Sequence, residues 1–153
     1  MTLHERWMKY ALREAERALE QNEVPVGAIV IHNNTIIAKG YNQVEMMHDP
    51  TAHAEMIALT AATAHRENKF LKDCVLYVTM EPCPMCAGAI VLSRIPTIVF
   101  GCYDPKMGAS GSVMNVTENK KLNHQVHVVG GVLDNECGAI VKEFFMKKRI
   151  QSE

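Results

Sequence analysis

The segment Pro82-Cys83-Pro84-Met85-Cys86 decides how this chain folds, because it combines two cysteines with a residue that starts helices. Proline suits the first helical position, where its missing N–H costs no hydrogen bond, so we expect a helix over 84–93 capped by Cys83. Cysteines at i and i+3 of a first turn project to one side, so both thiolates can reach one metal ion. The apolar run over 74–79, just before this segment, predicts a strand.

A second motif, His53-Ala54-Glu55, lies near the start of a helix that we predict over 52–64, with Thr51 or Asp49 as its cap. One histidine and two cysteines make three protein ligands, the number that leaves a catalytic zinc ion an open position for water. Zinc lowers the pKa of such a water to about 7. Glu55 is placed to take the water's proton and return it to the substrate. A His-x-Glu followed by Pro-Cys-x-x-Cys also matches the signature of the zinc-dependent nucleobase deaminases, so we expect a hydrolytic deaminase that binds Zn²⁺ through His53, Cys83 and Cys86.

Other uses of these cysteines remain open at this point. A Cys-x-x-Cys pair alone also occurs in redox proteins and zinc ribbons, although the sequence has no second such pair. A structural zinc site would need a fourth ligand, for which Cys74, Cys102 and Cys137 are candidates. In that case the protein would be a zinc-stabilised RNA-binding module rather than an enzyme.

The rest of the chain alternates between helical and strand patterns. An amphipathic pattern predicts a first helix, β-branched runs predict a hairpin turning at Asn33-Asn34, and a Gly- and Ser-rich segment predicts a long loop. The expected elements are helices over 4–22 and 133–149, strands over 26–31, 35–41, 97–101 and 126–129, and a loop over 103–123. This alternation indicates an α/β fold with a helix-covered sheet, and a length of 153 residues indicates a single domain, 1–153.

Composition limits the possible environment and partners. The chain has five cysteines, an odd number, and only two of them are close in sequence, so we do not expect a disulfide framework. Free thiols are typical of a reducing compartment. No signal sequence or apolar run of membrane-spanning length is visible, so we expect a cytoplasmic protein with no membrane partner. The net charge of −1 does not by itself indicate a nucleic-acid binder, so any such surface must be local.

The two motifs and their surroundings resemble the bacterial tRNA adenosine deaminase family. The resemblance is carried by Val24–Ala28, Asp49–Glu55, Leu76–Ala89, Ser93–Ile95, Gly108–Ser112, Asn123-His124 and Phe144-Phe145. It implies a three-layer cytidine-deaminase-like fold, with a five-stranded mixed sheet flanked by helices, and a homodimer. It also implies that hydroxide generated at zinc attacks C6 of the wobble adenosine of a tRNA anticodon stem-loop, typically of arginine tRNA. The product is inosine.

The resemblance also assigns substrate contacts. It places Asn42 in the pocket as a hydrogen-bonding partner of the base, although asparagine is also common at turns. Helix-start geometry adds the backbone N–H groups of Ala54 and Cys83 as donors to the purine or the addition intermediate. The remaining expected substrate-binding residues are Val26, Met80, Pro82, Asp104, Lys106, Asn123, His124, Phe145 and Arg149. Asp104 could instead shape its own loop, and Arg149 could instead complement the dipole of its helix. One of the adjacent Phe144 and Phe145 should face the core.

One residue departs from the family pattern. Pro84 stands between the cysteines, where many members carry an apolar residue and where free-guanine deaminases often carry proline. A deaminase of free guanine or cytidine is therefore the alternative substrate assignment. Such an enzyme would need a closed pocket and no loop for flanking nucleotides.

Overall fold

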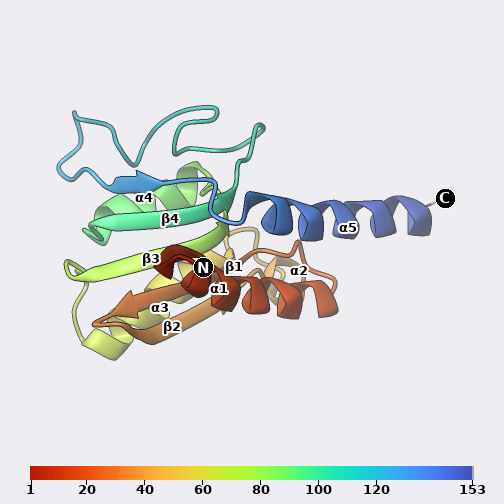
Figure 1. The fold of residues 1–153 in the computed structure, drawn as a ribbon, viewed down its shortest axis with the longest axis horizontal. Coiled ribbons are helices and arrows are strands. Elements are labelled where there is room, and N and C mark those ends of the chain that lie inside the picture. The colour runs from red at the N-terminus through yellow and green to blue at the C-terminus, as the bar shows by residue number, and fades with distance from the viewer. Residues whose placement is uncertain (153) are drawn as a thin grey trace.

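A five-stranded mixed sheet in the order β2-β1-β3-β4-β5 separates two layers of helices (Figure 1). The structure is a computed structural model that describes residues 1–152; Glu153, the last residue of the predicted domain, lies outside them. The strands are β1 Gly27–His32, β2 Thr35–Tyr41, β3 Cys74–Met80, β4 Thr97–Cys102 and β5 His127–Val129. β1 runs antiparallel to both β2 and β3, whereas β3, β4 and β5 are parallel to one another.

The helices divide between the two faces of the sheet. They are α1 Leu3–Glu20, α2 Val44–Met47, α3 Ala54–Arg66, α4 Pro84–Leu92 and α5 Asp134–Ser152. In Figure 1, α1 and α5 lie on the face toward the viewer, and α3 and α4 lie behind the strands. α5 also extends beyond the edge of the sheet and ends away from the body of the molecule (Figure 1). Among residues 1–152, none of the helices combines the length and apolar character that crossing a membrane requires.

The two-residue period of the strands explains this layering. Side chains alternate between faces along a strand, so Ala28 and Val30 join one core cluster, whereas Ile29 and Ile31 join the other. The first cluster includes residues of α3 and α4, and the second includes residues of α1 and α5. Strands that are apolar on both faces are typical of a sheet covered on both sides. The predicted helix-covered sheet is confirmed.

The predicted elements are found within three residues of their observed ends, with two corrections. The first concerns the start of α3, because His53 is its N-cap, and not Thr51 or Asp49. The Asp49 carboxylate instead accepts hydrogen bonds from the backbone N–H and hydroxyl of Thr51, which closes a turn before the helix. The second is α2, which lies between the predicted strand over 35–41 and the predicted helix over 52–64, where no element was predicted. A four-residue helix is too short to leave a periodic pattern in the sequence.

Candidate metal centre and substrate cavity

The two motifs meet because α3 and α4 begin at the same place. His53 is the N-cap residue of α3 and Cys83 is the N-cap residue of α4, and neither side chain makes a capping hydrogen bond. Both side chains are therefore free to face the space between the two helix starts. Nδ1 of His53 lies 3.5 Å from Sγ of Cys83 and 3.5 Å from Sγ of Cys86. The ligand atoms of the three residues all lie within 4.8 Å of one another.

This donor set fits a zinc ion. One imidazole nitrogen and two sulfurs are ligands that zinc prefers, and three of them leave a coordination position for water. The hydrogen bond from Cys86 lowers the pKa of the Cys83 thiol to about 4, with a further contribution from His53. That bond, together with burial, raises the pKa of Cys86, so Cys83, at the start of α4, forms the thiolate anion more readily. A helix N-terminus stabilises such an anion.

None of the other described cysteines joins this group as a fourth ligand. In the part of the chain that the structure describes, the group consists of His53, Cys83 and Cys86, while Cys74 belongs to a separate cluster with His32 and Asp73. In that cluster the Asp73 carboxylate is already paired with Arg66, at 3.1 Å. The alternative of a structural site closed by Cys74, Cys102 or Cys137 is therefore wrong.

Glu55 lies in the first turn of α3, two residues beyond His53, with only 4% of its surface exposed. Burial raises the pKa of its carboxyl group to about 7. A carboxylate with a pKa near neutrality can accept a proton and release it again at little cost, as a proton shuttle must. Glu55 thus lies beside the candidate ligands with the burial and pKa that a proton shuttle needs, and its catalytic role stays a prediction.

Asn42 follows β2 and is fixed by the start of α3. Its Oδ1 accepts a hydrogen bond of 2.8 Å from the backbone N–H of Ala54. The expectation that this N–H is free to bind the purine is therefore wrong in this structure, because Asn42 already takes its hydrogen. The bond orients the amide so that the Asn42 Nδ2 group, a donor, is left to meet a base. Asn42 is thus more than a turn residue at the end of a strand.

A cavity of about 860 Å³ opens above these groups. The predicted site residues that line it are Val26, Asn42, His53, Glu55, Met80, Cys83, Asp104, Lys106 and Phe145. A neighbouring hollow of about 420 Å³ shares Lys106 and Phe145 with it and adds Arg149. Residues 103–107 and α5 thus supply part of the cavity lining, and their contacts with RNA stay a prediction.

Several cavity residues were missed by the sequence analysis. Tyr103 belongs to the predicted loop over 103–123, while Lys142 comes from α5. The segment before β1 and α2 add further lining residues, namely Asn22, Glu23, Val24, Val44 and Glu45. Glu23 is buried, and its carboxylate accepts hydrogen bonds from the backbone N–H groups of Glu45 and Met46. The positive charge of Lys142 on the predicted last helix was the one available signal for that residue.

The structure resolves two alternatives, one for the adjacent phenylalanines and one for Asp104. Phe144 is buried and Phe145 is 45% exposed, so the core-facing member of the pair is Phe144. Oδ1 of Asp104 accepts hydrogen bonds from the backbone N–H groups of Lys106 and Met107, so this carboxylate shapes its loop. Pro82 is buried beneath the loop, and its carbonyl accepts a hydrogen bond from the N–H of Ala109.

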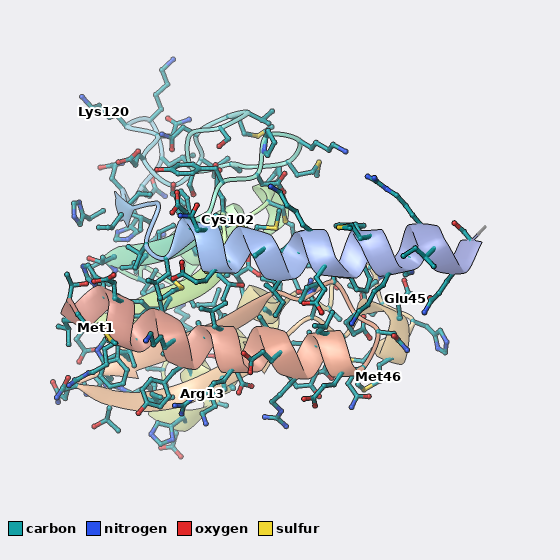
Figure 2. All side chains as sticks on the ribbon, turned by 45° about the vertical axis from the view of Figure 1, so that its right-hand side comes forward. Met1, Arg13, Glu45, Met46, Cys102 and Lys120 are labelled. Carbon is teal, nitrogen blue, oxygen red and sulfur yellow. The ribbon has the colours of Figure 1, made fainter. Side chains whose placement is uncertain are left out.

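The structure does not bring Asn123 and His124 to this cavity. Nε2 of His124 lies 2.7 Å from the carbonyl oxygen of Ile95, just before β4 begins, whereas the cavity lies where β4 ends, at Cys102. The length of the strand separates the two places by roughly 17 Å. In Figure 2, Lys120, from the loop before Asn123, and Glu45, from the cavity wall, lie at opposite ends of the molecule.

Comparisons with known proteins agree with this arrangement. The model of the MafB19-like deaminase family matches residues 2–149. The chain is 47% identical over 149 residues to the tRNA-specific adenosine deaminase of Bacillus subtilis (strain 168), which covers 97% of this chain and 92% of the relative.

Two solved structures are also similar. One comes from work on A-to-I editing by tRNA:A34 deaminases at the wobble position of transfer RNA; it has a TM-score of 0.83 and 37% identity over 87% of this chain and 96% of that chain. The guanine deaminase of Bacillus subtilis has a TM-score of 0.63 and 36% identity over 67% of this chain and 66% of that chain. The expected cytidine-deaminase-like fold is confirmed. From the family model and the relative at 47% identity, the chain belongs to the MafB19-like deaminases and, among them, to the tRNA-specific adenosine deaminase family.

Proposed function

We propose that this protein deaminates adenosine to inosine at the wobble position of a tRNA anticodon loop, with arginine tRNA as the expected substrate. The observation that carries the proposal is the position of the three-ligand group and Glu55 at the floor of a cavity walled by residues 103–107 and α5. The floor supports hydrolysis at a ring carbon, and the wall offers contacts beyond a single base. The relatives named above support adenosine as that base.

The residues of the chain divide the chemistry between them. His53, Cys83 and Cys86 would hold zinc, which when bound supplies the Lewis acidity that makes water a nucleophile at neutral pH. Glu55 accepts one proton of that water and delivers it to N1 of the purine, then transfers the hydroxyl proton of the C6 addition intermediate to the departing amine, which leaves as ammonia. Asn42 donates its amide N–H to the base while Ala54 holds its oxygen. Burial around Glu55 excludes bulk water from these transfers.

A base inside a duplex cannot reach this floor, so the substrate must present it unstacked, as an anticodon loop can. The side of the cavity formed by α5 and the loop combines an exposed aromatic ring, Phe145, with the cationic side chains of Lys106, Lys142 and Lys148. Aromatic rings stack on flanking bases and cations neutralise phosphates. A tRNA substrate would place the protein in the cytoplasm.

Free guanine is the competing substrate, and one solved relative is a guanine deaminase. A free base fills only the floor of a site and needs neither a basic wall nor a neighbouring hollow. The volume of about 860 Å³ and the extension past Lys106 and Phe145 toward Arg149 therefore favour a larger substrate. Pro84 begins α4 and does not line the cavity, so its identity does not bear on the base.

We also propose that two copies of the chain form the active unit. α4 is apolar along its whole length, yet Leu92 is 72% exposed and a Cβ added at Gly88 would meet nothing within 4 Å. A helix that is apolar on all sides is normally buried on all sides, so its outer face calls for a partner. The imidazole of His124 is hydrogen-bonded to the carbonyl of Ile95, three residues after Leu92, so it lies near the end of α4. A second copy packed on α4 would carry its Asn123 and His124 toward the substrate bound by the first copy.

The substrate is tested by incubating the zinc-loaded protein with an anticodon stem-loop bearing adenosine at the wobble position. Free adenosine, guanine and cytidine are assayed in parallel, and stem-loops with ACG and other anticodons are compared. We expect inosine to form in the ACG stem-loop. Deamination of free adenosine, guanine and cytidine should be much slower. Turnover of guanine alone would reverse the assignment.

The composite site is tested by mixing two inactive variants, Glu55→Ala and His124→Ala, after subunit exchange. If His124 acts on the partner's substrate, mixed dimers contain one complete site and regain activity. A mixture as inactive as its parts, together with a monomeric mass in solution, would refute the second copy.

A further inference from the structure

Glu81 is a buried carboxylate that the proposed chemistry does not use. It lies between β3 and the metal-ligand segment that starts at Pro82, and only 3% of its surface is exposed. A carboxylate so far from water must be satisfied by hydrogen bonds. The interest of Glu81 is that its partners all come from one loop far along the chain, residues 104–112.

The two oxygens of Glu81 have different partners. Oε1 accepts the backbone N–H of Asp104 at 3.1 Å and the hydroxyl of Ser112. Oε2 accepts the backbone N–H of Ser110 at 3.1 Å and that of Ser112 at 3.0 Å. Three backbone amides and one hydroxyl therefore converge on one side chain, and their loop is bent around it.

Neighbouring contacts fit the loop to this carboxylate. A Cβ added at Gly108 would lie 2.4 Å from Cδ of Glu81 and 2.5 Å from its Oε2, so only glycine allows the loop to approach so closely. The N–H of Ala109 donates to the carbonyl of Pro82, and the N–H of Glu81 donates to the carbonyl of Cys102. The loop is thus attached to the same short segment that carries the metal ligand Cys83.

The first residues of this loop form a wall of the cavity. Tyr103, Asp104, Lys106 and Met107 line it together with Glu81 itself, and Glu81 is bound to this group through the backbone N–H of Asp104. We propose that Glu81 is a positioning residue, which holds the loop over the cavity so that Asp104–Met107 meet the nucleotides beside the reacting base. The proposal rests on the proposed function, because those contacts require a substrate larger than one base.

The variant Glu81→Gln separates the two oxygens. An amide NH₂ placed at Oε2 would face two N–H donors, whereas placed at Oε1 it would face the N–H of Asp104 and the Ser112 hydroxyl, which can turn to accept. Glutamine should therefore keep the hydrogen bonds from the backbone N–H groups of Ser110 and Ser112 and lose the one from the N–H of Asp104. Glu118, an exposed carboxylate that accepts a hydrogen bond from Asn115, gives the matched control Glu118→Gln.

The experiment measures zinc content, amide hydrogen exchange and steady-state kinetics on wild type and both variants. In Glu81→Gln we expect one zinc per chain, faster exchange of the Asp104 amide than of the Ser110 and Ser112 amides, and a KM for the stem-loop raised about tenfold. We expect kcat to change less than about threefold, because Glu81 does not touch the reacting atoms. Glu118→Gln should match wild type in every measurement.

Two results would overturn the proposal. One is unchanged exchange at Asp104, which would show that the loop does not depend on this carboxylate. The other is a fall in kcat with KM unchanged, which would place Glu81 in the chemistry instead. If wild type itself fails to deaminate the stem-loop, the proposed function fails, and the exchange of the Asp104 amide still decides whether Glu81 holds the loop.

Discussion

The floor and the wall of the cavity are built in different ways. The floor consists of two short motifs at the starts of α3 and α4, in which functional residues lie within three positions of one another. The wall consists of loop 103–107, α2 and α5, whose positions depend on contacts between residues 20 or more apart, such as Glu23 with Glu45 and Glu81 with Asp104.

This difference indicates that the floor determines the chemistry and the wall determines the choice of substrate. Local motifs fix the geometry of the metal ligands, because a helix start determines the direction of its first side chains. The wall selects what reaches them, and it can change without disturbing the floor. Variants of the floor should therefore abolish the reaction, whereas variants of the wall should change affinity.

The largest effect is expected from Cys86→Ala, which removes one of the three ligands. We expect loss of zinc and of all measurable turnover, since metal binding here needs each donor. Metal analysis after gel filtration, with activity measured on the same fractions, checks this. Chelation of wild type followed by zinc readdition is the control, and it should remove and restore activity together.

Glu55→Ala should lower kcat by about 10³-fold or more while zinc stays at one per chain, because proton transfer is lost and the ligands are intact. Single-turnover rates and zinc content measured on one preparation test this. Loss of zinc from this variant would make Glu55 a ligand and the shuttle mechanism wrong.

Asn42 lies at the boundary between floor and wall, and two variants separate its roles. Asn42→Asp keeps an acceptor for the Ala54 N–H but replaces the amide donor, so we expect kcat/KM to fall about 100-fold with a modest change in stability. Asn42→Ala also leaves that N–H unpaired, which adds about 1–3 kcal/mol of destabilisation. Denaturant unfolding beside kinetics distinguishes the two, and equal stability of both variants would contradict the Asn42–Ala54 bond.

The adjacent phenylalanines of α5 give a matched pair. Phe144→Ala empties a buried position and should destabilise the protein by about 2–4 kcal/mol. Phe145→Ala removes an exposed ring and should leave stability within about 0.5 kcal/mol, while raising KM for the stem-loop roughly tenfold. Thermal unfolding and kinetics on both variants test the pair, and a KM unchanged in Phe145→Ala would remove that ring from the substrate surface.

The smallest effect is expected from Lys106→Ala. Loss of one phosphate contact should raise KM a fewfold at low salt and flatten the dependence of log Kd on log salt by about 0.7. Binding of the stem-loop at several salt concentrations measures the slope. An unchanged slope would mean that Lys106 lines the cavity without meeting a phosphate.

The same contrast explains what the sequence could predict. The alternation of helices and strands, Cys83 as a cap and the ligand group follow from local patterns, and the structure agrees with them. Glu23 and Glu81 could not be predicted, because an acidic residue that binds the backbone of a distant loop leaves no periodic pattern. Asn123 and His124 followed from resemblance alone, and only the folded chain shows that β4 separates them from the cavity.

The starts of α3 and α4 also affect how the protein responds to its metal supply. A helix whose capping residue makes no side-chain hydrogen bond forgoes about 1 kcal/mol, and here two helices do so side by side. A bound ion compensates for this through mass action, so the stability of the catalytic end rises with the free zinc concentration. The first turns of both helices are therefore expected to open more readily when zinc is scarce than when it is abundant.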